Sequence, residues 1–292
     1  MIDRLDNNRE KAIRTIKIML FSASIVPSLL GGALSYYYGS FDVIHFILVA
    51  LALFIGQAGG DYLYYYFTHR HTDTRDSHTK IFSGWRPLFT DILPKEKGTL
   101  YAGIFCLAID FIIGVYFTLT IGYVVIALAL LGGLVAIFFT PLMLKGYKEP
   151  VIFLTFGPLC LLGVYFVLTG QIDWTPVVVS LPIAFLVTVV AFLKGAHFEI
   201  KEQDGDAVIL KLSKSRILLL TVFAYLSLIV AIVVGAIPLW GLLGFLSLPI
   251  SIIVLRAVNK EDSYIKDYLW AVVRSIYALV IMGLTLSLSF II

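Results

Sequence analysis

Long apolar runs, separated by short polar or glycine-containing segments, follow one another along the whole chain of 292 residues. Each run has about 20 residues, which is the length that an α-helix needs to cross the hydrocarbon core of a bilayer. The pattern therefore predicts nine membrane-spanning helices. Their expected bounds are about 17–38, 43–67, 99–119, 121–142, 150–170, 175–195, 216–236, 238–256 and 270–291.

Two of these divisions depend on very short breaks. Thr120-Ile121-Gly122 separates the third span from the fourth, and Ala236-Ile237-Pro238 separates the seventh from the eighth. Glycine and proline are the residues that most strongly interrupt regular structure. We therefore interpret each break as a tight turn that joins two helices in a hairpin.

The positions of the basic residues support this count of spans. With these bounds, all 22 lysines and arginines fall in the N-terminal segment, in the even-numbered connections or in the span ends next to them, and the odd-numbered connections carry none. Lysine and arginine collect in the cytoplasmic connections of membrane proteins. The N-terminus is therefore expected in the cytoplasm and the C-terminus outside it, and removing or adding one span would destroy the alternation.

The composition excludes other classes of protein. Hydrophobic residues make up 60% of the chain, and the mean hydropathy is +0.95, more than a soluble domain needs. The formal net charge of +3 is too small to indicate a nucleic-acid partner. Cys106 and Cys160 both lie in apolar runs, as small core residues rather than a disulfide or metal pair. We expect one all-α domain, residues 1–292, that crosses the cell membrane many times.

Two of the cytoplasmic connections are long enough to hold chemistry. Residues 68–98 connect the second span to the third, and residues 196–215 connect the sixth to the seventh. Loops of this length without regular structure are usually functional. We expect both segments to be capping loops over one end of a central, lipid-accessible cavity that the helices surround.

Four segments resemble the motifs of one family. QAGGDYLYYYFTHRHTD resembles the first motif of the UbiA-type intramembrane prenyltransferases, and HTKIFSGWRPLFTDILPKEK resembles the stretch that follows it. EPVIFLTFGPLCLLGVYFVLTGQ resembles the fifth span of the subset that prenylates 1,4-dihydroxy-2-naphthoate. GAHFEIKEQD stands where the second motif is expected. Nine spans with two long loops on one face are also similar to the UbiA type.

The resemblance implies an enzyme that moves a polyprenyl group from its diphosphate to a hydrophobic acceptor, either an aromatic quinone precursor or a lipid. In the family's reaction the diphosphate leaves as pyrophosphate, and two Mg²⁺ ions held by aspartates offset its charge. The family pattern for these aspartates is N-D-x-x-D-x-x-x-D on the second span and D-x-x-x-D on the sixth. The resemblance therefore also implies Mg²⁺ as a cofactor.

The first motif departs from this pattern. Tyr64, Tyr65 and Thr68 stand where the family has its asparagine and its two leading aspartates. Asp73 stands in the place of the third acid. Asp61 lies one helical turn before Tyr65, and residues four apart share one face of a helix, so Asp61 is expected to reach the same cavity.

The second motif departs from the pattern as well. Glu199 replaces the first aspartate, and Gln203 replaces the second, with Asp204 beside it. The basic side of the family's site is retained, and basic side chains can hold a diphosphate directly. The matching basic residues are Arg70, Lys80 and Arg86.

The candidate site residues form three groups. The catalytic candidates are Asp61, Asp73 and Glu199. The substrate-binding candidates are Tyr65, Thr68, Arg70, Lys80, Arg86 and Lys201. The metal-binding candidates are Asp73, Asp76, Glu199 and Asp204. We expect the two capping loops to bring Arg86 and Glu199 together at the anionic headgroup of the polyprenyl substrate.

Other interpretations of the same residues stay open. The tyrosines within 62–66 either line a cavity that shields a carbocation or form an aromatic belt at the membrane surface. His69 and His71, near Asp73, have a spacing that suits a transition metal. Lys194, at the edge of the sixth span, can be a lysine that only extends to the headgroups.

The replaced aspartates also favour a second kind of function. A UbiA-fold protein that has lost catalysis would bind isoprenoid lipids or a protein partner without turnover. A transporter is a third class, and it is disfavoured because the spans contain few polar residues and no clear inverted repeat.

Overall fold

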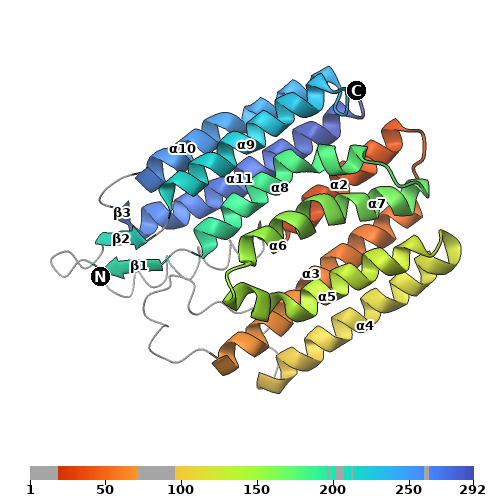
Figure 1. The fold of residues 1–292 in the computed structure, drawn as a ribbon, viewed down its shortest axis with the longest axis horizontal. Helices are drawn as coiled ribbons and strands as arrows, with labels where there is room; N and C mark the ends of the chain where they lie inside the picture. Colours follow the sequence, from red (N-terminus) through yellow and green to blue (C-terminus); the bar gives the residue numbers. More distant parts are fainter. Residues whose placement is uncertain (1–18, 72–95, 196, 201–206, 212, 260–262) are drawn as a thin grey trace.

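The computed structural model describes residues 19–71, 96–195, 197–200, 207–211, 213–259 and 263–292. This part of the chain consists mainly of long helices that lie side by side (Figure 1). The predicted all-α, polytopic membrane fold is confirmed.

The helices coincide with the apolar runs of the sequence. They are α2 (Ser22–Tyr37), α3 (Val43–His71), α4 (Glu96–Thr120), α5 (Val124–Leu144), α6 (Lys148–Leu154), the π-helix η2 (Thr155–Leu159), α7 (Cys160–Thr169), α8 (Thr175–Lys194), α9 (Lys214–Val233), the 3₁₀-helix η3 (Leu239–Ser247), α10 (Leu248–Asn259) and α11 (Ile265–Ser289). Among the described residues, eight helical segments are long and apolar enough to cross a bilayer. The shorter α2 occupies the place of the first predicted span.

Both short breaks between spans are turns, as predicted. Gly122, between α4 and α5, has a φ of 146°, and Gly235, after α9, has a φ of 74°. Glycine adopts positive φ values at little cost because it has no Cβ. Each turn lets the following helix run back beside the preceding one.

One end of the bundle holds the connections that the sequence analysis identified as long and basic. Four helices, α3, α5, α8 and α10, end there, and α4, α6, α9 and α11 begin there (Figure 1). We call this end the cap end. The opposite end carries the short turns and the C-terminus (Figure 1). That the cap end faces the cytoplasm stays a prediction from the basic residues.

A small β-sheet lies at the cap end, and the sequence analysis did not anticipate it. Strands β1 (His197–Ile200) and β2 (Ala207–Lys211) form an antiparallel hairpin inside the segment that was expected to be a loop. Strand β3 (Ser263–Tyr264), from the connection between α10 and α11, pairs with β2. The sheet therefore joins two connections that are far apart in the sequence. That residues 68–98 and 196–215 cap a cavity stays a prediction.

The most deeply buried core lies where α2, α8, α9 and α11 meet. Leu30, Ile183, Leu228 and Met282 are each at most 1% exposed there. On the other side of the molecule α3 packs closely on α4, because glycines remove side chains from the contact. A Cβ placed on Gly59 would lie 3.0 Å from the Cβ of Cys106. Cys106 and Cys160 are both free thiols, as expected from their apolar surroundings.

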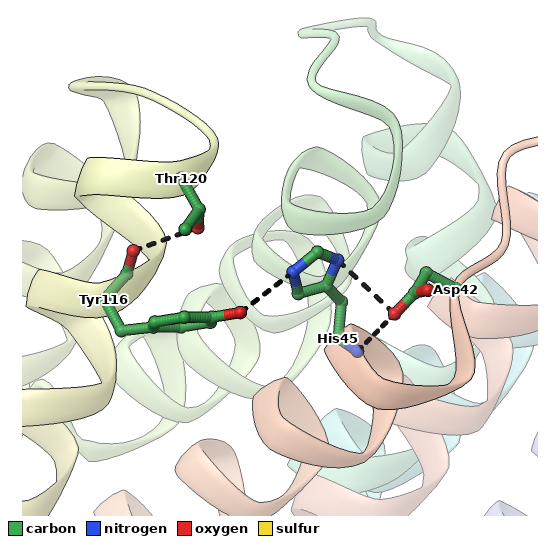
Figure 2. Close-up of polar contacts among 4 residues, drawn as sticks. All are labelled: Asp42, His45, Tyr116 and Thr120. Atoms are coloured by element: carbon green, nitrogen blue, oxygen red, sulfur yellow. Dashed lines mark hydrogen bonds and ion pairs between the residues drawn. The ribbon is translucent and has the colours of Figure 1, made fainter.

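Polar contacts join α3 and α4 at the opposite end (Figure 2). Asp42 precedes α3, and its carboxylate accepts a hydrogen bond of 2.7 Å from the backbone N–H of His45. The His45 ring lies between this carboxylate, 3.4 Å from Nδ1, and the Tyr116 hydroxyl of α4, 3.3 Å from Nε2. The helix that carries the first motif, α3, is therefore joined to α4 at the end of the bundle far from the cap end.

Candidate active site

The described residues form a polar stripe along one face of α3. Gln57, Asp61, Tyr64 and Thr68 follow one another at intervals of four, three and four residues. Side chains at this spacing lie above one another on the same face of a helix. We call these four residues the α3 stripe. The stripe leads from the middle of α3 toward the cap end.

Asp61 faces a cation from another helix. An electrostatic interaction couples Asp61 with Lys194, the last residue of α8. Both side chains are half-buried among the helices. Acidic and basic residues inside a membrane are costly, and they usually pair with each other or face a cavity. Asp61 therefore interacts with a basic residue inside the bundle, and Lys194 does more than extend to the membrane surface. That Asp61 is a functional acid stays a prediction.

Gln57 marks the inner limit of the α3 stripe. Its Nε2 donates a hydrogen bond of 3.1 Å to the backbone carbonyl of Leu20. Because a carbonyl only accepts hydrogen bonds, this contact fixes the orientation of the amide and turns Oε1 the other way. Among the described residues, this buried Oε1 has no hydrogen-bond partner. The rings of Phe21 and Phe54 lie beside this region with their centroids 4.4 Å apart.

The tyrosines of the first motif pack inside the bundle. Tyr62 and Tyr66 are each 8% exposed. The ring of Tyr64 meets Phe139 of α5 edge to face, with centroids 5.7 Å apart, and its hydroxyl interacts with that of Thr68. Tyr65 is half-buried. This burial favours the interpretation of these residues as part of an internal wall over that of a lipid-facing belt.

Two side chains from other helices contact the end of α8. The Nζ of Lys148, the first residue of α6, donates a hydrogen bond of 2.8 Å to the carbonyl of Ala191. The hydroxyl of Tyr268, from α11, donates to the carbonyl of Leu193. The carbonyl of Ala191 also accepts a hydrogen bond of 3.1 Å from the backbone N–H of Gly195, so Lys148 adds a charged donor to a carbonyl that already has a partner in the backbone.

Most of the other sequence-predicted residues lie outside the described residues. They are Asp73, Asp76, Lys80, Arg86, Lys201 and Asp204, together with the side chains of Arg70 and Glu199. The backbone of Glu199 belongs to β1, where it stands opposite Ile209 of β2. The expected meeting of Arg86 and Glu199 stays a prediction.

Comparison with known proteins decides the family. A model of the UbiA prenyltransferase family matches residues 24–279. The chain belongs to the UbiA prenyltransferase family. No curated protein and no solved structure matches it. The match covers α2 to most of α11, so the α3 stripe and the end of α8 both lie within the UbiA region. Membership supports a membrane prenyltransferase in general.

UbiA prenyltransferases generally use Mg²⁺ bound through aspartate motifs, so we tested whether the described residues fit such an ion. Within the part of the chain that the structure describes, no three histidine, cysteine, aspartate or glutamate side chains are grouped so that they could hold a metal. Asp61, the acid of the α3 stripe, interacts electrostatically with Lys194. Mg²⁺ prefers carboxylate oxygens, whereas the stripe offers mainly hydroxyl and amide groups. The described residues therefore do not fit a two-Mg²⁺ site.

Sequence reasoning missed three residues of this site. Lys148 and Lys194 each stand at a span boundary, where a lysine is also expected for topology alone, so nothing in the sequence separated the two roles. Gln57 is the first residue of the segment that resembles the first motif, and it was not among the candidate site residues. Its signal was that of an amide within an apolar run, which is costly unless the amide is hydrogen-bonded.

Proposed function

We propose that the protein transfers a polyprenyl group from its diphosphate to a hydroxylated aromatic acceptor of the quinone-precursor type, or to a lipid acceptor. The observation that carries this proposal is the pair of Asp61 and Lys194 at the cap end of a UbiA-family bundle. The pair places a carboxylate and an ammonium within the polar part of an otherwise apolar interior. A lipid-tailed diphosphate and a hydrophobic acceptor need such surroundings.

The charges suggest a division of roles. In the reaction the bond between C1 of the prenyl group and the diphosphate oxygen breaks, and the electron pair leaves with pyrophosphate. Lys194 provides positive charge toward that leaving group, and Arg70, Lys80, Arg86 and Lys201 are the further cations that we assign to it. A nucleophilic atom of the acceptor then bonds to C1 and loses a proton.

Asp61 is our candidate for the group that takes this proton. It lies on α3 between Gln57 and Tyr64, and a general base must lie within hydrogen-bond reach of the atom that it deprotonates. The packed rings of the first motif exclude water from an allylic cation and stabilise it through their faces. Tyr65 and Thr68 belong to the same wall, and we assign Asp73 and Glu199 to the diphosphate side.

The test uses the full chain reconstituted in liposomes. A radiolabelled polyprenyl diphosphate is supplied with 1,4-dihydroxy-2-naphthoate, with Mg²⁺ or with EDTA, and both prenylated product and pyrophosphate are measured. Asp61→Asn is expected to lower kcat by about 100-fold or more, because general-base catalysis contributes about 10²–10⁴-fold. The matched control is Asp173→Asn, which removes an exposed carboxylate at the opposite end and should leave transfer unchanged. Pyrophosphate release that never exceeds that of an Asp73→Asn, Glu199→Gln double variant would refute the proposal.

A second candidate function rests on the composition of the first motif. Tyr64 replaces the family's asparagine, and Tyr65 and Thr68 replace its two leading aspartates. All three are at least half-buried in the bundle, and their hydroxyl groups carry no charge. Such a protein would bind isoprenoid diphosphates or lipids without releasing pyrophosphate. Donor binding that persists in EDTA without any pyrophosphate release would favour this function. Proton- or voltage-driven solute flux in the same liposomes would favour a transporter instead.

A further inference from the structure

We propose that Lys148 is a positioning residue, which holds the end of α8 so that Lys194 faces Asp61. The contact between Lys148 and the backbone of α8 is direct, with 2.8 Å between Nζ and the carbonyl oxygen of Ala191. Lys148 comes from α6, 43 residues earlier in the chain. Its functional consequence rests on the proposed function, in which Lys194 provides charge at the site.

The end of α8 is held on two sides. Lys148 contacts the carbonyl of Ala191 from α6, and Tyr268 contacts the carbonyl of Leu193 from α11. Leu193 and Tyr268 are at most 1% exposed, so this second contact lies in the core. Lys194 follows directly on the held carbonyls. These two contacts therefore hold the backbone just before Lys194, in addition to the packing of α8 on its neighbours.

Direct packing between α3 and α8 does little to set the distance from Asp61 to Lys194. α3 packs mainly on α4, α5 and α2, whereas α8 packs mainly on α9, α11, η2 and α6. The two charged residues are thus carried by different groups of helices. The contact of Lys148 with the carbonyl of Ala191 is one of the contacts that hold the end of α8, where Lys194 stands.

The residue type at position 148 suits this role. The C-terminal end of a helix carries a partial negative charge, which a cation stabilises better than a neutral donor does. Gly195 leaves the room that the ammonium occupies, because a Cβ at position 195 would lie 2.6 Å from Nζ of Lys148. The absence of a side chain at Gly195 therefore leaves space for the ammonium of Lys148 at the end of α8.

Lys145 provides a matched control. It is a lysine only three residues away, at the end of α5, and it is exposed beside an apolar groove of about 410 Å³ that α5 side chains line. Substitution of either lysine by methionine shortens the side chain by one atom, keeps it unbranched and removes its charge. A general effect of positive charge at the cap end would appear in both variants, whereas a positioning effect would appear only at Lys148.

The experiment is a double-mutant cycle on the full chain in liposomes, with the KM for the polyprenyl diphosphate and kcat as readouts. K148M should raise the KM for the polyprenyl diphosphate about tenfold and change kcat less. The loss of a hydrogen bond from a charged group typically changes an equilibrium constant by about that factor. In a K194M background K148M should add less than about twofold, because its effect passes through Lys194. K145M should stay within about twofold of the wild type. Effects of K148M and K194M that multiply, or an equal effect of K145M, would overturn the proposal.

A measurement without substrate separates this proposal from the proposed function. Asp61→Cys and Lys194→Cys are combined in a chain in which Cys106 and Cys160 are replaced by alanine, and the pair is joined with a short bis-maleimide. The yield should fall severalfold when K148M is added and should not change when K145M is added. Equal yields with and without K148M would overturn the proposal, even if the enzyme is active. An inactive wild-type protein with the expected change in yield would overturn only the proposed function.

Discussion

The closest approach between the fifth and sixth spans predicts the effect of adding one methyl group. Gly157 lies in the π-helix η2, against α8. A Cβ at position 157 would stand 2.3 Å from the Cβ of Ala184 and 3.2 Å from its Cα. Ordinary contacts between carbon atoms are about 3.5–4.0 Å, so Gly157→Ala forces the two helices apart. Ala184 is 0% exposed, which leaves no solvent into which either side can yield.

The magnitude follows from comparison with a second glycine in the same span. Forcing an extra methyl group into a packed core costs about 1–3 kcal/mol. Any Gly→Ala change inside a helix also gains about 0.5–1 kcal/mol through backbone entropy. A Cβ placed on Gly163, six residues later, would meet no atom of a neighbouring helix within 4 Å. Gly163→Ala therefore has the same gain in backbone entropy and no overpacking of the core. Gly157→Ala should therefore be less stable than Gly163→Ala by about 1–3 kcal/mol.

The assay is reversible unfolding in mixed micelles with increasing SDS, followed by far-UV circular dichroism. The free energy of unfolding is compared for the wild type and the two variants under identical conditions. Gly163→Ala should match or exceed the wild type, and Gly157→Ala should fall below it. Equal free energies for the two variants would show that η2 and α8 do not pack as closely as described.

Two other substitutions test separate parts of the structure. Tyr225→Phe removes a buried hydroxyl that lies 2.8 Å from both Ser247 Oγ and Ser251 Oγ, and it should lower the free energy of unfolding by about 0.5–2 kcal/mol. Tyr277→Phe, at an exposed position on α11, should change it by less than about 0.5 kcal/mol, and equal effects would contradict the role of the network. Hydrogen bonds from the Thr175 hydroxyl and from the backbone N–H groups of Thr175 and Trp174 hold the pKa of the exposed Asp173 carboxyl below its usual value. A lowered folded-state pKa stabilises the fold above the unfolded value of about 3.9, and this contribution is lost as the pH falls through the folded value. Stability measured from pH 5 downward should thus depend less on pH in Asp173→Asn than in the wild type, and an identical dependence would contradict the prediction.

The spans could be predicted because the bilayer imposes a length and a composition on every helix that crosses it. The apolar runs and the absence of lysine and arginine from alternate connections indicated the fold, and even the short breaks near Gly122 and Gly235 are turns. These signals are local in sequence. They depend on the solvent that each segment meets, and not on which helices become neighbours.

The hairpin of β1 and β2 could not be predicted on the same basis. His197–Ile200 and Ala207–Lys211 are short and lie in a segment with many charged residues. The alternation in HFEI and the apolar run AVIL extend over only four residues each, which is too few to separate a strand from a loop. The pairing of β2 with β3 joins residues more than 50 positions apart, Ala207 with Tyr264. Such a contact depends on where α10 and α11 bring the chain.

Only one partner of the interaction between Asp61 and Lys194 could be singled out from the sequence. Asp61 was conspicuous because an acid in an apolar run is costly. Lys194 was not, because a lysine at the end of a span satisfies the topology rule without any partner. Only the three-dimensional arrangement of the helices shows that the two charges interact.

This coupling gives the replaced aspartates a physical meaning. Carboxylates at positions 65 and 68 would repel a diphosphate until bound cations reversed their charge. In this chain those positions carry uncharged hydroxyl groups, and the charge of the remaining acid of the α3 stripe is offset by Lys194. The loss of the acids and the presence of an internal lysine therefore act in the same direction, since both make the stripe less repulsive toward an anion. Returning an aspartate at Tyr65 alone would restore the repulsion without restoring the ligand set for Mg²⁺, so donor affinity should fall in that variant.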